Sequence, residues 1–135
     1  MDYAFTTEVK VRFAETDAQG IAHHAVYVVW FEVARIEYLA RFGGGYPQLQ
    51  AEGIEALTLD VNVRYLAPAR FDDRLTVGAR CGDVRGARFA FDYAVERDGV
   101  RVAEGSTGHA CVDAQTLRPR RVPTWLAEAV AAAER

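Results

Sequence analysis

The chain has 135 residues, half of them apolar, and a formal net charge of −3 at pH 7. This length predicts one domain, residues 1–135, with one hydrophobic core. The slight negative charge and the lack of a basic arm argue against a nucleic-acid-binding protein. The longest apolar run, residues 25–31, is too short to cross a bilayer. Residues 1–8 lack a signal-peptide pattern, and the isolated cysteines Cys81 and Cys111 fit reduced thiols, so we expect a cytoplasmic protein.

The first elements predicted along the chain are a strand and an unusually apolar helix. Residues 5–13 alternate between apolar and polar side chains, which is typical of a half-buried strand. Residues 25–42 are predicted to form a helix. The β-branched and aromatic residues 26–31 would also suit a strand, but the segment is too long for one and ends at three glycines, residues 43–45. Because the first half of this helix has no polar face, we expect other elements to surround it.

The rest of the chain is mostly β-structure. We predict a short helix over residues 47–52 and a final helix over residues 125–133. Four strands are predicted between them, at residues 59–65, 75–81, 89–95 and 100–112, with a hairpin turn at 98–99. The connections are too short for crossover helices, so these strands are expected to be antiparallel neighbours. One apolar helix and one curled sheet fit a helix wrapped by a sheet, whose open edges predict pairing between two copies.

The candidate chemistry lies between the first strand and the helix. Asp17 lies too far before the helix to cap it, although a lone Asp after a strand is also a common turn former. Ala22, His23 and His24 occupy the positions of a cap and are not favoured capping residues, so backbone N–H groups there are expected to be free for a ligand. A carboxylate beside such donors could attack, or activate water against, a carbonyl whose oxygen the donors hold.

The two adjacent histidines do not predict a metal site. Neighbouring residues on a helix face different directions, and only His109 is available as a third histidine. We therefore expect no metal, and we expect one histidine to orient the loop or to line a pocket. His24 is an alternative to Asp17 as general base.

Two small groups of arginines stand out in this acidic chain. They are either solvated surface charges or binding groups for phosphates, which arginine binds well. The groups are Arg85 with Arg88, and Arg118 with Arg120 and Arg121.

The residues before and within the helix occur at the spacing of a known family. The residues in step are Asp17, Gly20, Ile21, His24, Tyr27, Phe31, Glu32 and Arg35. Their run resembles that of the hot-dog-fold acyl-CoA thioesterases, and is most similar to the 4-hydroxybenzoyl-CoA thioesterase group and its Tol–Pal-associated relatives. The chain departs from that pattern at Glu15, where Asp is frequent, and at His23, where Tyr or Trp is usual.

The resemblance implies an α+β hot-dog fold, in which a curved five- or six-stranded antiparallel sheet wraps a long central helix. It implies dimers that often assemble into tetramers, and an enzyme that hydrolyses acyl-CoA to a carboxylate and free coenzyme A without a further cofactor. Asp17 would be the nucleophile or the general base. The backbone N–H of His24, with Gly20 or Ile21 nearby, would polarise the thioester carbonyl.

The resemblance also suggests where the substrate binds. Ile21, His23 and Tyr27 are assigned to substrate binding, although an aromatic residue on a buried helix more often belongs to the core. Coenzyme A phosphates would contact surface arginines. The candidates are Arg85, Arg88, Arg118 and Arg120.

Two other functions stay open from the sequence. A hot-dog hydratase or dehydratase would act on acyl thioesters with a histidine and a carboxylate that transfer protons at carbon. A non-catalytic acyl-CoA-binding module is the third hypothesis, and the presence of Asp17 in the motif argues against it. The sequence does not define the acyl group.

Overall fold

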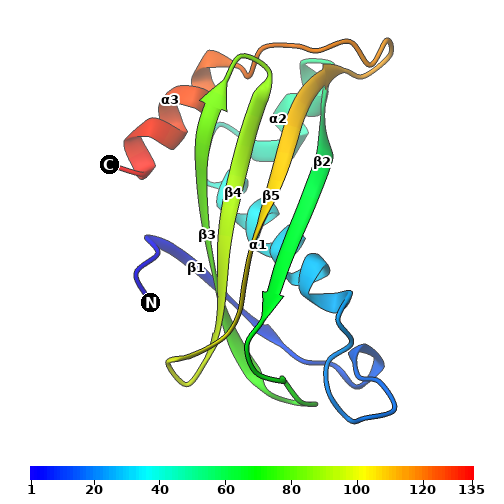
Figure 1. Ribbon diagram of the computed structural model, residues 1–135. Coiled ribbons are helices and arrows are strands. Elements are labelled where there is room, and N and C mark those ends of the chain that lie inside the picture. The colour runs from blue at the N-terminus through cyan, green and yellow to red at the C-terminus, as the bar shows by residue number, and fades with distance from the viewer.

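The computed structural model describes all 135 residues as a curved sheet packed against a central helix (Figure 1). The elements in chain order are β1 (Phe5–Lys10), the 3-10 helix η1 (Phe13–Glu15), α1 (Val26–Ala40), α2 (Gly45–Ala51), β2 (Ile54–Tyr65), β3 (Arg74–Arg85), β4 (Arg88–Arg97), β5 (Val100–Asp113) and α3 (Thr124–Ala133). α2 and α3 lie at the end of the sheet that is opposite η1 (Figure 1). None of the helices has the length and apolar character needed to span a membrane.

The strand order in the sheet is β1-β3-β4-β5-β2, and all neighbouring strands are antiparallel. The predicted α+β class, with a helix packed against one antiparallel sheet, is therefore confirmed. The expectation that β2 and β3 are neighbours was wrong, because residues 66–73 carry the chain across the end of the sheet. An extended segment of this length reaches about 26 Å, which exceeds the roughly 15 Å across three strand spacings. β2 consequently pairs with β5 and forms one edge of the sheet.

Several element boundaries differ from the predictions, and two of the differences bear on the fold. β1 ends at Lys10, so Phe13 is not an inward-facing strand residue; it lies in η1 and is 75% exposed. β2 begins earlier than predicted, at Ile54, and contains a bulge at residues 58–60. The hairpin turn at residues 98–99 is confirmed, because both residues have positive φ, at 51° and 79°.

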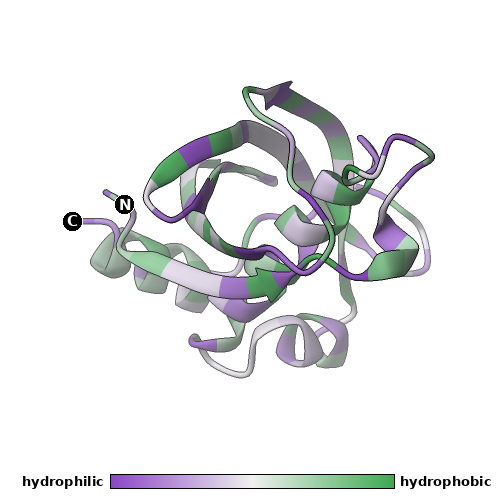
Figure 2. Ribbon diagram, turned by 90° about the horizontal axis from the view of Figure 1, so that it is seen from below, coloured by the Kyte–Doolittle hydropathy of each residue, from purple (hydrophilic) through white to green (hydrophobic).

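The core lies between α1 and the concave face of the sheet, which curves around the helix (Figure 2). The rings of Phe31 on α1 and Tyr93 on β4 stack with their centroids 4.3 Å apart. On the other side of α1, Val29 is 50% exposed and Ile36 is 44% exposed. The expectation that other elements surround the helix is thus wrong for one chain, because the sheet covers only one side of it.

A row of hydrogen bonds crosses this apolar core. Arg35 donates from Nη1 to the Tyr93 hydroxyl (3.1 Å), and that hydroxyl shares a bond of 2.7 Å with Oγ1 of Thr107. Oγ1 of Thr107 shares a further bond of 2.7 Å with Nε2 of His109. Burial, together with the positive charge of Arg35, lowers the pKa of His109 to about 4. The row therefore ties α1 to β4 and β5 through neutral groups and one buried cation.

Candidate active site

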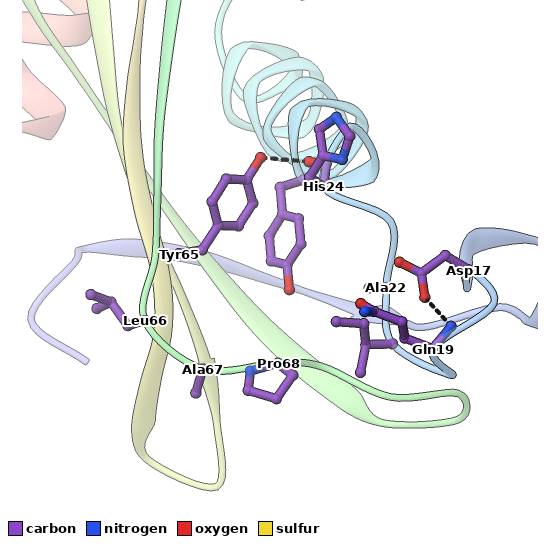
Figure 3. Close-up of a pocket in the computed structure, with 10 residues that line it drawn as sticks. Asp17, Gln19, Ala22, His24, Tyr65, Leu66, Ala67 and Pro68 are labelled. Carbon is purple, nitrogen blue, oxygen red and sulfur yellow. Dashed lines mark hydrogen bonds between the residues drawn. The ribbon is translucent and has the colours of Figure 1, made fainter.

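A pocket of about 470 Å³ opens where the N-terminal end of α1 meets the end of β2 (Figure 3). Its walls are mostly apolar, and they contain one carboxylate. The lining residues are Asp17, Gln19, Ile21, Ala22, His24, Tyr27, Tyr65, Leu66, Ala67 and Pro68. The pocket therefore combines the segment that was singled out in the sequence with a second segment, at the end of β2, that was not.

Asp17 lies in a tight turn at one wall of the pocket. Its N–H donates to the carbonyl of Ile21 (2.9 Å), and its own carbonyl accepts the N–H of Gly20 (2.9 Å). Oδ1 of Asp17 accepts the N–H of Gln19 at 2.8 Å, which makes an Asx turn (Figure 3). Gly20 has a φ of 78°, a conformation that favours glycine. Asp17 is thus both a turn former and a pocket residue, and Oδ2 makes no hydrogen bond to the protein.

The start of α1 leaves some backbone donors free and occupies others. The N-cap residue is Ala25, which follows the predicted cap positions 22–24, and it makes no side-chain cap. The expectation that the backbone N–H groups at the helix start are free is wrong for two of them. Nδ1 of His23 accepts the N–H of Ala25 (3.2 Å), and the carbonyl of His23 accepts the N–H of Val26 (3.0 Å). The N–H groups of Ile21 and His24 have no acceptor in the protein, and both residues line the pocket. These two groups can therefore bind a ligand oxygen.

Hydrogen bonds join the two walls of the pocket. The N–H of Ala22 donates to the carbonyl of Ala69 (2.7 Å), and the Tyr65 hydroxyl donates to the carbonyl of His24 (2.7 Å). The ring of Tyr65 also packs edge-on against Tyr27, with centroids 5.0 Å apart and planes at 84°. Sequence reasoning missed Tyr65, and its only signal was an aromatic residue at the last inward position of a predicted strand.

Two residues predicted for the site lie beside the pocket without lining it. Gly20 is adjacent to it, but its N–H already donates to Asp17. The His23 ring stacks on the His24 ring, with centroids 4.2 Å apart and planes 29° from parallel. Both imidazoles are exposed, so the pair lies at the rim of the pocket.

The structure does not gather the predicted arginines at the pocket. Arg85 and Arg88 lie together beside a second pocket, of about 230 Å³, at the turn between β3 and β4. Arg120 donates from Nη1 to the carbonyls of Glu52 (3.2 Å) and Gly53 (3.4 Å), and so holds the turn before β2. Arg118 is exposed. Only Arg85 and Arg88 therefore share a concave surface.

Groups for metal or thiol chemistry do not converge on the pocket. No three side chains of the His, Cys, Asp and Glu types lie together as a metal-binding group. Cys81 and Cys111 are free and buried, and burial raises the pKa of these thiols to about 12 and about 11.

Comparisons with known proteins identify the family of the chain. The model of the thioesterase-like superfamily matches residues 11–130. The chain belongs to this superfamily. It is 32% identical over 120 residues to the acyl-CoA thioester hydrolase YbgC of Escherichia coli, a match that covers 88% of the chain and 90% of the relative.

Two solved structures from Thermus thermophilus extend the comparison. The hypothetical protein TT1821 has a TM-score of 0.88 and 37% identity, covering 95% of this chain and 98% of that one. A thioesterase complexed with coenzyme A and Zn has a TM-score of 0.85 and 25% identity, covering 99% of this chain and 97% of that one. The predicted hot-dog thioesterase family is therefore confirmed.

Proposed function

We propose that the chain is an acyl-CoA thioesterase that hydrolyses a thioester to a carboxylate and free coenzyme A. The observation that carries this proposal is a single pocket lined by the half-buried Asp17 carboxylate and by His24, whose N–H has no protein acceptor. The superfamily match, the similarity to an acyl-CoA thioester hydrolase and the similarity to a coenzyme A-bound thioesterase support the class of reaction.

Asp17 is the group that we expect to act on the substrate. Its Oδ1 is occupied by Gln19, and its Oδ2 is free to attack the carbonyl carbon or to take a proton from an attacking water. As a nucleophile, Asp17 would form a mixed anhydride that water hydrolyses; as a general base, it would deprotonate water directly. Both routes consume one water and release a carboxylic acid and the coenzyme A thiol.

The carbonyl oxygen gains negative charge while the new bond forms. A fixed N–H at the positive end of a helix stabilises such an oxygen, because the donor and the helix dipole need no reorganisation during the reaction. The N–H of His24 meets this description, since it lies at the start of α1 and has no other acceptor. Gly20 does not, because its N–H is occupied by Asp17.

We further propose that the working form is a homodimer joined along β2. This strand is an open edge of the sheet, and three of its apolar side chains are exposed: Leu57 at 40%, Leu59 at 47% and Val61 at 43%. Long apolar edges promote association unless they are paired. Antiparallel pairing of two β2 strands would join the two sheets into one. Assembly into a tetramer stays a prediction.

Such a dimer would also give Arg85 and Arg88 a role. Within one chain, Arg88 is in register with Ala110 on β5 and, through it, with Leu57 on β2. That row lies about 25 Å along the strands from Tyr65 and the pocket. Antiparallel pairing brings the far end of one sheet towards the near end of the other, so these arginines would approach the partner's pocket and could bind coenzyme A phosphates.

Hydrolysis assays test the proposal directly. Short, long and aromatic acyl-CoA substrates are supplied, and a thiol reagent measures the coenzyme A that is released. Asp17→Asn keeps the side-chain oxygen of the Asx turn but loses the carboxylate, so kcat should fall by about 10²–10⁴ while the fold persists.

Asp113→Asn is the matched control. Oδ1 of Asp113 accepts the N–H groups of Gln115 (2.9 Å) and Thr116 (3.0 Å), so it forms the same kind of turn away from the pocket. This variant should keep wild-type turnover. Wild-type turnover in Asp17→Asn would refute the role of Asp17. Hydration of an enoyl thioester without thiol release would favour a hydratase, and saturable binding without hydrolysis would favour a binding module.

A further inference from the structure

We propose that Tyr65 is a positioning residue for the hydrolysis, because its hydroxyl fixes the backbone whose N–H is expected to stabilise the thioester oxygen. This inference rests on the function proposed above. The hydroxyl donates to the carbonyl of His24 at 2.7 Å, across 41 positions in the sequence and from the edge of the sheet to the start of α1 (Figure 3). Tyr65 would therefore act through His24 and not on the reacting atoms.

The bonds around His24 show what the hydroxyl accomplishes. A peptide group is planar, so bonds to its carbonyl and to its N–H fix the whole unit. In the peptide between His24 and Ala25, Tyr65 holds the carbonyl and Nδ1 of His23 holds the N–H. In the preceding peptide, the carbonyl of His23 accepts the N–H of Val26 (3.0 Å), and the N–H of His24 is the one group without a partner. The free N–H of His24 therefore lies beside three groups that are already hydrogen-bonded, which are the carbonyls of His23 and His24 and the N–H of Ala25.

No side-chain cap at the start of α1 supplements this tether. The N-cap residue Ala25 makes no side-chain hydrogen bond, and the bond from Ala25 to the His23 ring is long, at 3.2 Å. The first turn of a helix has no partners for its own N–H groups and frays easily. The hydrogen bond from Tyr65 therefore restrains the orientation of His24 from outside the helix.

Tyr65 is itself well held. It is the last residue of β2 and pairs with Ala103 on β5. Its ring packs edge-on against Tyr27, which packs in turn against Trp30 (4.8 Å between centroids), and both of these side chains are only 2% exposed. The hydroxyl therefore takes its position from a strand and a buried helix face, which are rigid supports. Partial burial raises the pKa of Tyr65 above its usual value, so the hydroxyl remains a donor near neutral pH.

Tyr65→Phe is the decisive variant, because it removes one hydroxyl and keeps the ring that packs on Tyr27. An oxyanion donor must lie within a few tenths of an ångström of its position, so we expect kcat to fall about tenfold while KM changes by less than about twofold. Affinity for a thioether analogue of acyl-CoA, which has no carbonyl, should be unchanged. Amide hydrogen exchange at residues 23–27 should become faster.

Tyr46→Phe is the matched control. Its hydroxyl accepts a hydrogen bond from Nε of Arg35 (3.3 Å) and does not line the pocket. Removing it should lower the melting temperature without changing kcat or the exchange at residues 23–27. A purely structural role for Tyr65 would give the same result as this control.

The outcomes separate the inference from the function on which it rests. Wild-type kcat in Tyr65→Phe, in a protein that Asp17→Asn inactivates, would overturn the positioning role and leave the proposed function standing. An increase in KM at unchanged kcat would show that the hydroxyl binds substrate, which also overturns the inference. If the wild-type protein hydrolyses no acyl-CoA, both proposals are wrong.

Discussion

Oγ1 of Thr107 and Nε2 of His109 share a hydrogen bond of 2.7 Å in the core of the protein. Arg35 can only donate, and Thr107 is the only other hydrogen-bond partner of the Tyr93 hydroxyl, so the Tyr93 proton has its one acceptor in Thr107. The Thr107 hydroxyl then donates to Nε2 of His109. The buried cation therefore sets the direction of the whole row, and it assigns the His109 proton to Nδ1, which lies 3.4 Å from Oγ1 of Thr58.

The burial of His109 predicts how the stability of the protein depends on pH. Burial and the Arg35 charge lower the pKa of His109 from 6.5 to about 4, so the unfolded chain binds the proton more readily than the folded chain. The stability that the neutral ring provides is full above about pH 6.5 and is lost as the pH falls towards and through 4. One such group changes the free energy of unfolding by at most about 1.4 kcal/mol per pH unit.

His109→Asn removes the titrating ring and keeps polar atoms that can bond to Thr107. Chemical denaturation at several pH values should show a shallower loss of unfolding free energy between pH 6.5 and 4 than in the wild type. An unchanged slope would show that another group causes the acid sensitivity.

Gly105 on β5 should not tolerate a side chain. A Cβ there would lie 2.3 Å from the backbone oxygen of Asn62 and 2.7 Å from the Phe31 ring. Gly105→Ala should therefore lower the free energy of unfolding by about 1–3 kcal/mol, as other overpacked cores do. Gly82→Ala on β3 is the control, because a Cβ there meets nothing within 4 Å. Equal stability of both variants in urea denaturation would contradict the close packing of Phe31 against β5.

Charges on the exposed edge should prevent the proposed dimer from forming. Replacing both Leu57 and Leu59 by Lys puts like charges opposite each other along the proposed β2–β2 contact, so the variant should sediment as a monomer. Val100→Lys is the control, because Val100 is also exposed (59%) but begins the hairpin strand β5, away from the β2 edge. Analytical ultracentrifugation measures the oligomeric state of each variant. A double variant that stays dimeric would place the interface elsewhere.

The second pocket gives a prediction about substrate affinity. If Arg85 and Arg88 of a partner bind coenzyme A phosphates, replacing both by Ala should raise KM for acyl-CoA by about tenfold and leave kcat unchanged. The effect should shrink at high salt, because exposed charge pairs are screened. Arg80→Ala, on the outer face of the same strand β3, should keep the wild-type KM. Equal KM values for the two variants would remove Arg85 and Arg88 from the substrate site.

Local patterns in the sequence predicted the elements well. The helix was predicted over residues 25–42 and is observed over Val26–Ala40, because three glycines with positive φ stop it. The motif residues Asp17, Ile21, His24 and Tyr27 all line one pocket, since they lie close together along the chain.

Contacts between distant segments could not be predicted in this way. The bond from Tyr65 to His24 depends on which strand lies beside the helix start, and that follows from residues 66–73 crossing the sheet. Arg120 looked like a phosphate ligand in the sequence because nothing near it showed that it bonds to the carbonyls of Glu52 and Gly53. The exposure of Val29 likewise depends on how much of α1 one sheet can cover.

A homodimer joined along β2 would make catalysis and assembly interdependent, because Tyr65 lies on that edge strand. β2 is bonded on one side only, to β5, and Tyr65 is its last residue. A second copy bound along β2 would stiffen the strand that carries the tether to His24. Specific activity per chain should then rise with enzyme concentration and level off once the dimer is saturated, as mass action requires. A lower concentration of the protein would therefore reduce the turnover of each chain as well as the number of chains.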